Sequence, residues 1–397
     1  MNRHTIAQTT ALLLAGALAA VSLTGCGVPA SASVAPSSEA ASSEAPASSA
    51  PASSAPASSA PVSSAPASSA PSSTAPVSSA PAVTSTPAGG ISLAEETTPS
   101  GHYNNTVDPY YSQYVLVCGD YALEIIGGAS PNASYANTVT AFAEQYPKLN
   151  VACAIIPKSS AFNHPDQYAS EYNVQKNFID GTYALMGSRV KTVDAFGEMT
   201  RHAGEYMFYR TDHHWNSLGA YYASVAYGRA MGIQTRALAD YQTVFTSGYV
   251  GSLYTFCGSP KPECLRQHPD VTVGRLPRAS YTMTYTTGGV TYAGKAVDAA
   301  NSGYLMFMEG DQAYTDIVTG NQTGRKLLVF KESYGNAFVP YMIDYYDEII
   351  VLDIRQETPS TASIIAEHGI TDALIINNMQ AANTGEQITR LQAKTQS

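Results

Sequence analysis

The chain has 397 residues, with 21 Lys and Arg against 31 Asp and Glu, which gives a formal net charge of −10. No basic cluster interrupts this acidic balance, so the composition argues against nucleic-acid binding. Residues from about 29 to 90 are almost entirely Ser, Ala and Pro, which leaves residues from about 100 to 397 to form one large folded domain.

The N-terminal segment, MNRHTIAQTTALLLAGALAAVSLTGCG, combines Arg3, an apolar run and the sequence Leu-Thr-Gly-Cys ending at Cys26. This order is typical of a secretory signal, and the apolar run is too short and alanine-rich for a permanent membrane span. Leu-Thr-Gly-Cys resembles the bacterial lipobox, in which the cysteine is acylated. We therefore expect a lipoprotein signal peptide over residues 1–25 and a lipid on Cys26 that anchors the protein, outside the cytoplasm, to the bacterial cell membrane. The alternative is an ordinary secreted protein with an unmodified cysteine.

A tether is predicted over residues 26–98, where a five-residue unit such as ASSAP recurs. Small residues and prolines offer too little apolar area to offset the entropy of ordering the chain. We expect an extended, partly polyproline-II spacer that carries the domain away from the membrane.

Alternating strand and helix patterns follow in residues 99–397. Two segments have helical patterns, 137–146 and 217–231, and the second has Asn216 as a candidate N-cap and Gly232 as a stop signal. Continuous apolar runs between helices predict an α/β fold with a mostly parallel sheet and helices on both faces. Residues 240–325 carry little helical pattern and are predicted to be an irregular insertion of turns and β-hairpins. The predicted buried strands are 114–118, 151–156, 190–193, 326–330, 349–352 and 373–376.

Four cysteines remain besides Cys26. Outside the cytoplasm an even number permits disulfides. Cys257 and Cys264 flank a turn-prone loop and are the favoured pair, whereas Cys118 and Cys153 lie in apolar runs and either pair or are simply buried. Neither pair has the close spacing of a zinc site.

The segment YRTDHHWNSLGAYY, residues 209–222, contains the first candidate chemistry. In an extended stretch Asp212 and His214 point the same way, so the carboxylate can orient the imidazole as in a hydrolytic triad. His213 should then face away from Asp212. Trp215 is expected to pack at the entrance of the following helix rather than to bind a sugar. Metal binding by Asp212, His213 and His214 is the alternative.

The second candidate for chemistry lies in the segment KLLVFKESYGNAFVPYMIDYY, residues 326–346. A buried strand runs directly into Ser333, and a helix pattern follows. A serine at a sharp strand-to-helix turn presents its hydroxyl at the carboxyl edge of the sheet, as in a nucleophile elbow, although G-x-S-x-G is absent. Gly335 permits a close turn. The alternative is that Ser333 only caps the helix.

Together the two segments resemble the DHHW family of bacterial envelope proteins, which is related to alginate O-acetyltransferases and more distantly to SGNH hydrolases. The resemblance covers most of residues 100–397. It implies an SGNH-hydrolase-like sheet and a triad of Ser333, His214 and Asp212, in an order that differs from SGNH hydrolases, where the serine comes first in a GDS block. Glu332 stands where the family usually has Asp. The matching segments are 155–158, 209–215, 219–222, 310–311, 331–336 and 352–355.

The resemblance implies acyl transfer: a serine O-acyltransferase or acetylesterase that acts on a cell-envelope polysaccharide and needs no cofactor or metal. Arg355 and Arg210 are candidates either to contact an acidic sugar or to form structural ion pairs. The expected partners are an acyl donor, the polysaccharide and the membrane, and the resemblance leaves open a membrane protein that exports acyl groups. The alternative function is a non-catalytic glycan-binding lipoprotein. The expected oxyanion and substrate-binding residues are Gly335, Asn336, Tyr334, His213, Arg355 and Arg210.

Overall fold

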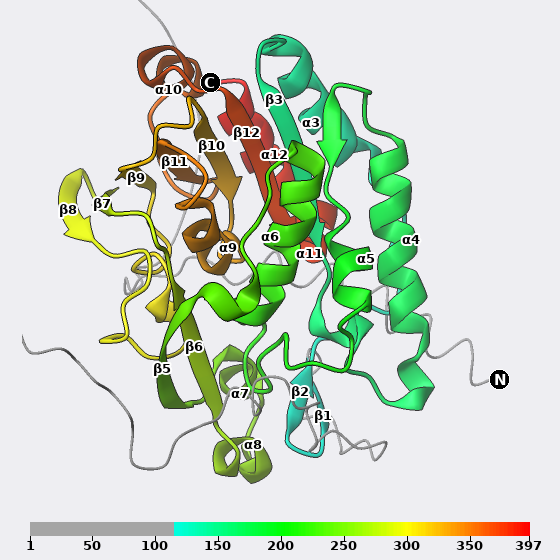
Figure 1. Ribbon diagram of the computed structural model, residues 1–397. Helices are drawn as coiled ribbons and strands as arrows, with labels where there is room; N and C mark the ends of the chain where they lie inside the picture. The colour runs from blue at the N-terminus through cyan, green and yellow to red at the C-terminus, as the bar shows by residue number, and fades with distance from the viewer. Residues whose placement is uncertain (1–114) are drawn as a thin grey trace, which may run out of the picture. The chain divides into compact units, whose positions relative to one another are not determined.

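The computed structural model describes residues 115–397, and Figure 1 shows how their helices and strands are arranged. The predicted signal peptide, Cys26, the tether and Tyr114 lie outside the described residues. Within residues 115–397, no helix is both long and apolar enough to cross a membrane.

An eight-stranded sheet forms the centre of the fold, in the order β4-β3-β12-β10-β11-β9-β7-β8. The first five strands of this order are parallel, and the last three pairings are antiparallel. The parallel strands are β3 (Asn150–Ile156), β4 (Val190–Thr192), β10 (Lys326–Lys331), β11 (Glu348–Asp353) and β12 (Asp372–Asn378), and the antiparallel ones are β7 (Tyr281–Thr287), β8 (Val290–Gly294) and β9 (Tyr314–Thr319).

Helices cover both faces of the sheet, because successive strand residues point to opposite faces and both sets are apolar. In β3, for example, Ala152 and Ala154 pack into one core, and Val151 and Cys153 into the other. The first core is closed by α5 (Ala195–Thr200), α6 (Ser217–Met231) and α9 (Gly335–Met342). The second is closed by α3 (Ala133–Gln145), α4 (Ser170–Ala184), α10 (Thr361–His368), α11 (Met379–Asn383) and α12 (Gly385–Thr395). The predicted α/β fold is therefore confirmed.

The helix predicted over residues 217–231 is confirmed with its boundaries. The Asn216 side chain accepts hydrogen bonds from the N–H groups of Leu218 (2.9 Å) and Gly219 (3.3 Å), which satisfies two donors of the first turn. Gly232 ends the helix in the left-handed conformation at φ 68°. This fixed start matters because the predicted D-x-H pair lies directly before it.

The predicted insertion, residues 240–325, is only partly separate from the main sheet, because its second half contributes strands to that sheet. Its first part is a two-stranded sheet of β5 (Gln242–Tyr249) and β6 (Asp270–Leu276), with α7 (Ser252–Phe256) and α8 (Glu263–Gln267) between them. Its second part, β7 to β9, joins the main sheet, because alternating side chains such as Met283 and Ile317 reach the first core. The short helical turn η5 (Gly303–Met306) connects β8 to β9.

Outside the main sheet, the predicted strand 114–118 forms only a small hairpin of β1 (Leu116–Cys118) and β2 (Tyr121–Leu123). Three further turns of 3-10 helix are η2 (Ser159–Ala161), η3 (Asp166–Tyr168) and η4 (Leu238–Asp240). No disulfide joins Cys257 to Cys264, so the favoured pairing is not formed in the structure. Cys153 is fully buried in β3, and burial raises the pKa of its thiol to about 12.

Candidate active site

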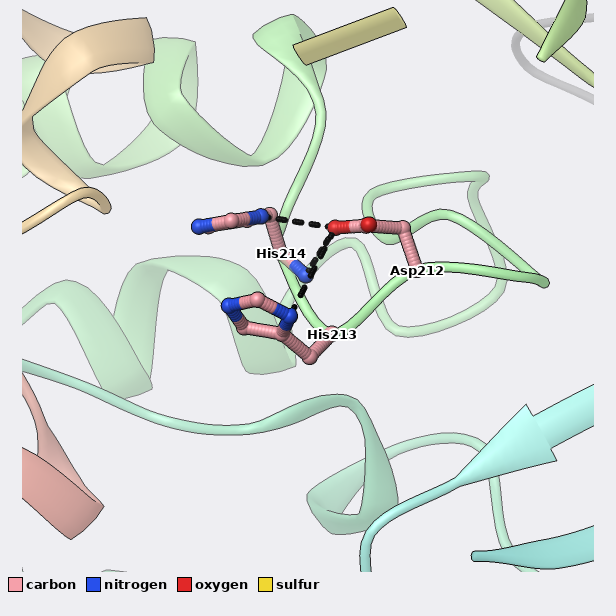
Figure 2. A group of neighbouring side chains, drawn as sticks. All are labelled: Asp212, His213 and His214. Carbon is pink, nitrogen blue, oxygen red and sulfur yellow. Dashed lines mark hydrogen bonds and ion pairs between the residues drawn. The ribbon is translucent and has the colours of Figure 1, made fainter. Parts of the chain in front are cut away.

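The loop before α6 holds Asp212 and His214 together, as the i and i+2 spacing predicts. Asp212 Oδ1 lies 2.6 Å from His214 Nδ1 and also accepts the backbone N–H of His214 at 2.9 Å. Figure 2 shows the carboxylate facing the Nδ1 side of the ring, so that Nε2 points away from Asp212. Both side chains are buried, Asp212 at 2% and His214 at 7% exposure, so the pair is shielded from solvent.

Ser333 meets the free end of that imidazole. It follows β10 at the turn into α9, and its Oγ lies 2.7 Å from His214 Nε2. Ser333 does not cap the helix: the N-cap position is Tyr334, and no side chain caps there. A Cβ on Gly335 would lie 2.5 Å from Lys331 Cβ, which explains why the tight turn needs glycine here. The structure thus joins Ser333, His214 and Asp212 in one hydrogen-bonded row.

The second oxygen of Asp212 is held by residues that the sequence analysis did not single out. Asp212 Oδ2 accepts hydrogen bonds from the Tyr249 hydroxyl at 2.8 Å and from the Ser252 N–H at 2.7 Å. Burial alone would raise the pKa of Asp212, but the charge and hydrogen bond of His214 and the Ser252 N–H hold it well below its usual range. The carboxylate is therefore ionised and fixed in orientation.

Tyr304, in η5, contacts both His214 and the turn that carries Ser333. Its ring stacks on His214 with centroids 3.8 Å apart and planes 7° apart. Its hydroxyl donates to the carbonyl oxygens of Ser333 (2.9 Å) and Tyr334 (3.1 Å). Tyr249, Ser252 and Tyr304 all come from residues 240–325. Apart from the high tyrosine content of that region, no sequence signal marked them.

His213 does not face away from Asp212 as expected. The loop bends between Asp212 and Trp215 instead of running as an extended strand, and the His213 ring lies against His214 with centroids 3.8 Å apart. Ser252 Oγ accepts the His213 N–H at 3.4 Å and lies 2.5 Å from His213 Nδ1. Burial and the neighbouring His214 hold the pKa of His213 well below its usual range, so this ring is neutral at pH 7.

A neutral His213 that receives the Ser252 hydroxyl proton at Nδ1 carries its own proton on Nε2. Within residues 115–397, His213 Nε2 has no hydrogen-bond partner, and the side chain is 26% exposed. In the described part of the chain, His213 therefore presents an unpartnered ring nitrogen next to His214, and this nitrogen is an N–H donor in the tautomer in which Ser252 donates to Nδ1.

The expected oxyanion donors are mostly engaged within the protein. The Gly335 N–H donates to the Glu332 carbonyl at 3.0 Å, and the Asn336 side chain donates to Asp311 at 2.9 Å. The Tyr334 N–H donates to the Glu332 carboxylate at 3.2 Å. Of these turn amides in the described part of the chain, the Ser333 N–H has no acceptor.

Tyr334 and Glu332 brace the turn. Tyr334 is fully buried, its hydroxyl donates to the His213 carbonyl at 2.6 Å, and its own carbonyl accepts the Trp215 indole N–H at 2.9 Å. Trp215 is likewise fully buried, which confirms its predicted packing role. Glu332 accepts the Asn378 N–H at 2.8 Å and approaches Ser333 Oγ at 3.2 Å, so it ties the end of β10 to the end of β12.

The two arginines are held by carboxylates. Arg355, just after β11, bonds Asp353 through two nitrogens at 2.8 and 2.6 Å and contacts Asp311 at 2.8 Å. Arg210 lies 3.4 Å from Asp270, which is fully buried. The sequence left open whether these arginines contact a substrate or form structural ion pairs. In this structure both form structural ion pairs.

Asp212, His213 and His214 are also close enough together to be considered as metal ligands. They form one of two such groups in residues 115–397, with all potential ligand atoms within 4.8 Å of one another. Two ligands on a tetrahedral ion at about 2.1 Å would sit about 3.4 Å apart. The 2.6 Å between Asp212 Oδ1 and His214 Nδ1 is instead a hydrogen-bond distance, and Nε2 is directed at Ser333. The geometry therefore favours a hydrogen-bonded triad over a metal centre.

A mostly parallel sheet between two helical layers, with a serine at the turn after a central strand, places this chain in the SGNH-hydrolase-like class of α/β folds. The profile of the DHHW protein family matches residues 96–352, and the chain belongs to that family. A DHHW family protein from Eubacterium siraeum is 32% identical, with a TM-score of 0.64 over 70% of this chain and 94% of that one.

Two other solved structures are similar at lower identity. Bacillus cereus PatB1, solved with a sulfonyl adduct, is 18% identical with a TM-score of 0.56 over 69% of this chain and 97% of that one, which supports the shared fold. The O-acetyltransferase domain of Pseudomonas putida AlgJ is 14% identical with a TM-score of 0.38 over 69% of this chain and 96% of that one. No curated protein matches the chain.

Proposed function

We propose that this protein is a serine acyl-transfer enzyme, an O-acyltransferase or acetylesterase, that acts on a cell-envelope polysaccharide. The observation that carries the proposal is the 2.7 Å contact between Ser333 Oγ and His214 Nε2, with Asp212 at 2.6 Å on the other ring nitrogen. A nucleophile, a base and an orienting carboxylate in one row are the parts that covalent acyl transfer requires.

In the first half-reaction, Ser333 Oγ attacks the carbonyl carbon of an ester while His214 Nε2 takes the hydroxyl proton. Asp212, held ionised, stabilises the imidazolium that forms. The oxyanion is placed to accept the Ser333 N–H, and the His213 Nε2–H is the second candidate donor. When the intermediate collapses, His214 returns the proton to the departing alcohol, and an acyl group remains on Ser333.

In the second half-reaction, a hydroxyl group attacks the acyl-Ser333 ester and gives its proton to His214. Collapse of this intermediate breaks the bond to Ser333 Oγ, which takes the proton back. A sugar hydroxyl as attacking group makes the protein a transferase, and water makes it an esterase. The same side chains serve both outcomes, because the base acts on whichever hydroxyl is bound next to it.

The setting of the reaction follows from the N-terminal sequence. A lipid on Cys26 would hold the protein on the outer side of the cell membrane, and the Ser/Ala/Pro tether would let the domain reach polysaccharide beyond it. The acyl donor and a membrane protein that exports acyl groups are the further partners in this proposal.

Labelling tests the proposal directly. A serine-directed sulfonyl fluoride should modify the detergent-extracted, full-length protein once, at Ser333, because His214 activates that hydroxyl alone. Peptide mass spectrometry locates the adduct, and intact mass on the same sample should show the acyl chains on Cys26. Heat-denatured protein is the control and should not react. A folded protein that never labels at Ser333 would instead be the glycan-binding lipoprotein of the alternative hypothesis.

Gly251 gives a second test, because a Cβ at this position would lie 2.5 Å from Asp212 Oδ2 and 2.8 Å from Asp212 Cα. Gly251→Ala should therefore push the carboxylate off His214 and lower kcat for an activated acetyl ester by about 100-fold, the usual effect of a 1 Å misplacement. Gly204→Ala is the matched control, because its Cβ would meet nothing within 4 Å. Equal kcat values for the two folded variants would contradict this role of Asp212.

A further inference from the structure

His214 belongs to a column of neighbouring rings that ends at the exposed residue Phe256. Tyr304 stacks on His214, and the His213 ring lies against His214 with centroids 3.8 Å and planes 37° apart. His213 in turn faces the Phe256 ring at 6.3 Å with planes 24° apart. Phe256 lies in α7, one helical turn after Ser252. Ser252 is the residue that holds Asp212 and His213. Phe256 is 53% exposed, so α7 presents an aromatic side chain to solvent next to His213.

The cations near Ser333 are already neutralised. Lys158 pairs with Glu124 at 2.5 Å, and Lys331 pairs with Asp353 at 2.8 Å and Asp311 at 3.3 Å. Arg355 is held by the same two aspartates. Burial alone would raise the pKa of Asp311, but the charges of Lys331 and Arg355 hold it well below its usual range.

Recognition of a sugar carboxylate normally uses an arginine or lysine whose N–H groups are available to it. A uronic acid at this site would have to break one of these ion pairs and would lie near the ionised Asp212. Protonated amino sugars gain little either, because the half-exposed carboxylate of Asp311 is shared by two cations. The charges around Ser333 therefore favour neither an anionic nor a cationic sugar over a neutral one.

We propose that the acceptor or ester-bearing unit is an uncharged sugar, whose apolar face lies on Phe256 and whose polar edge lies beside His213. This inference rests on the proposed function and names the substrate class of the same site. It departs from the acidic sugar considered for Arg355 and Arg210, because both guanidinium groups are committed to aspartates.

The test uses full-length protein that has first been shown to label at Ser333 and to turn over an activated acetyl ester, so that failure of the proposed function is seen separately. Oligosaccharides of equal length are then compared as acyl acceptors and as inhibitors of ester turnover: neutral (glucose, mannose, galactose, N-acetylglucosamine), anionic (mannuronate, galacturonate) and cationic (glucosamine). We expect at least one neutral series to exceed both charged classes by tenfold or more. Preference for a uronate, or no effect of any glycan, would overturn the inference.

Phe256→Ala should raise the KM for the neutral glycan by about tenfold, because stacking on an aromatic ring contributes up to about that factor. Tyr292→Ala is the matched control: Tyr292 is an exposed aromatic residue (46%) on β8, outside the ring column. Phe256→Arg supplies an unpaired cation at this exposed position and should shift acceptor preference toward uronates in a salt-sensitive way. An unchanged KM in Phe256→Ala would show that this ring does not bind the glycan.

Discussion

Replacing Ser333 by Ala is expected to abolish turnover of an activated acetyl ester, with kcat falling by about 10⁶-fold. The reason is that no other described hydroxyl is hydrogen-bonded to His214 Nε2, so the covalent route is lost as a whole. Losing the nucleophile of a triad typically costs as much as losing the entire triad. The measurement is single-turnover release of acetate at saturating substrate.

The fold should survive this change. Among residues 115–397, Ser333 Oγ is hydrogen-bonded only to His214 and Glu332. Glu332 keeps its bonds to two backbone N–H groups. Ser224→Ala is the matched control: it also removes a buried hydroxyl, but one that bonds the Tyr221 carbonyl within α6. A Ser333→Ala protein that melts with the wild type and still releases acetate at the wild-type rate would remove Ser333 from the mechanism.

The sheet could be predicted from the sequence because its central strands are buried on both faces. Such strands appear as unbroken apolar runs, and five of the six predicted runs are strands of the main sheet. The sixth, which becomes β1, has the same composition but is covered by a local hairpin and the Leu253–Leu265 region. An apolar run indicates that a strand is buried, but it does not indicate which sheet the strand joins.

The triad contacts were predictable for a similar reason. The i and i+2 spacing of Asp212 and His214 is local, and the turn after a buried strand fixes Ser333 at the sheet's carboxyl edge. The position of His213 was not predictable, because it depends on a bend that Ser252 stabilises from 39 residues away. Side chains of a loop follow its tertiary contacts more than its sequence pattern.

The region that looked irregular in the sequence completes the site. Tyr249 and Ser252 fix Asp212, and Tyr304 supports His214 and the Ser333 turn. Phe256 faces His213. The α/β frame thus supplies the three groups of the proposed triad at two loop positions. Residues 240–325 supply the groups that orient them, and for this reason we expect this region to set substrate choice.

Asp212→Asn is expected to lower kcat by about 10⁴-fold with little change in KM. The amide can still bond His214 Nδ1, but it no longer stabilises the imidazolium and it favours the wrong ring tautomer. Tyr249 and Ser252 would keep the side chain in place, so the geometry should persist. Asp180→Asn on α4 is a control for the same chemical change at an exposed site.

The same variant has a second readout, the pH dependence of stability. The pKa of Asp212 is lower in the folded protein than in the unfolded chain, so its contribution to the free energy of unfolding is complete above about pH 4 and is lost as pH falls through the folded pKa. Asp212→Asn lacks this titration, and its free energy of unfolding should fall less steeply than that of the wild type below about pH 4. Denaturant titrations from pH 7 down to pH 2 measure the difference. Parallel curves would mean that the carboxylate is not held ionised by His214 and the Ser252 N–H, and the orienting role of Asp212 would then lose its electrostatic basis.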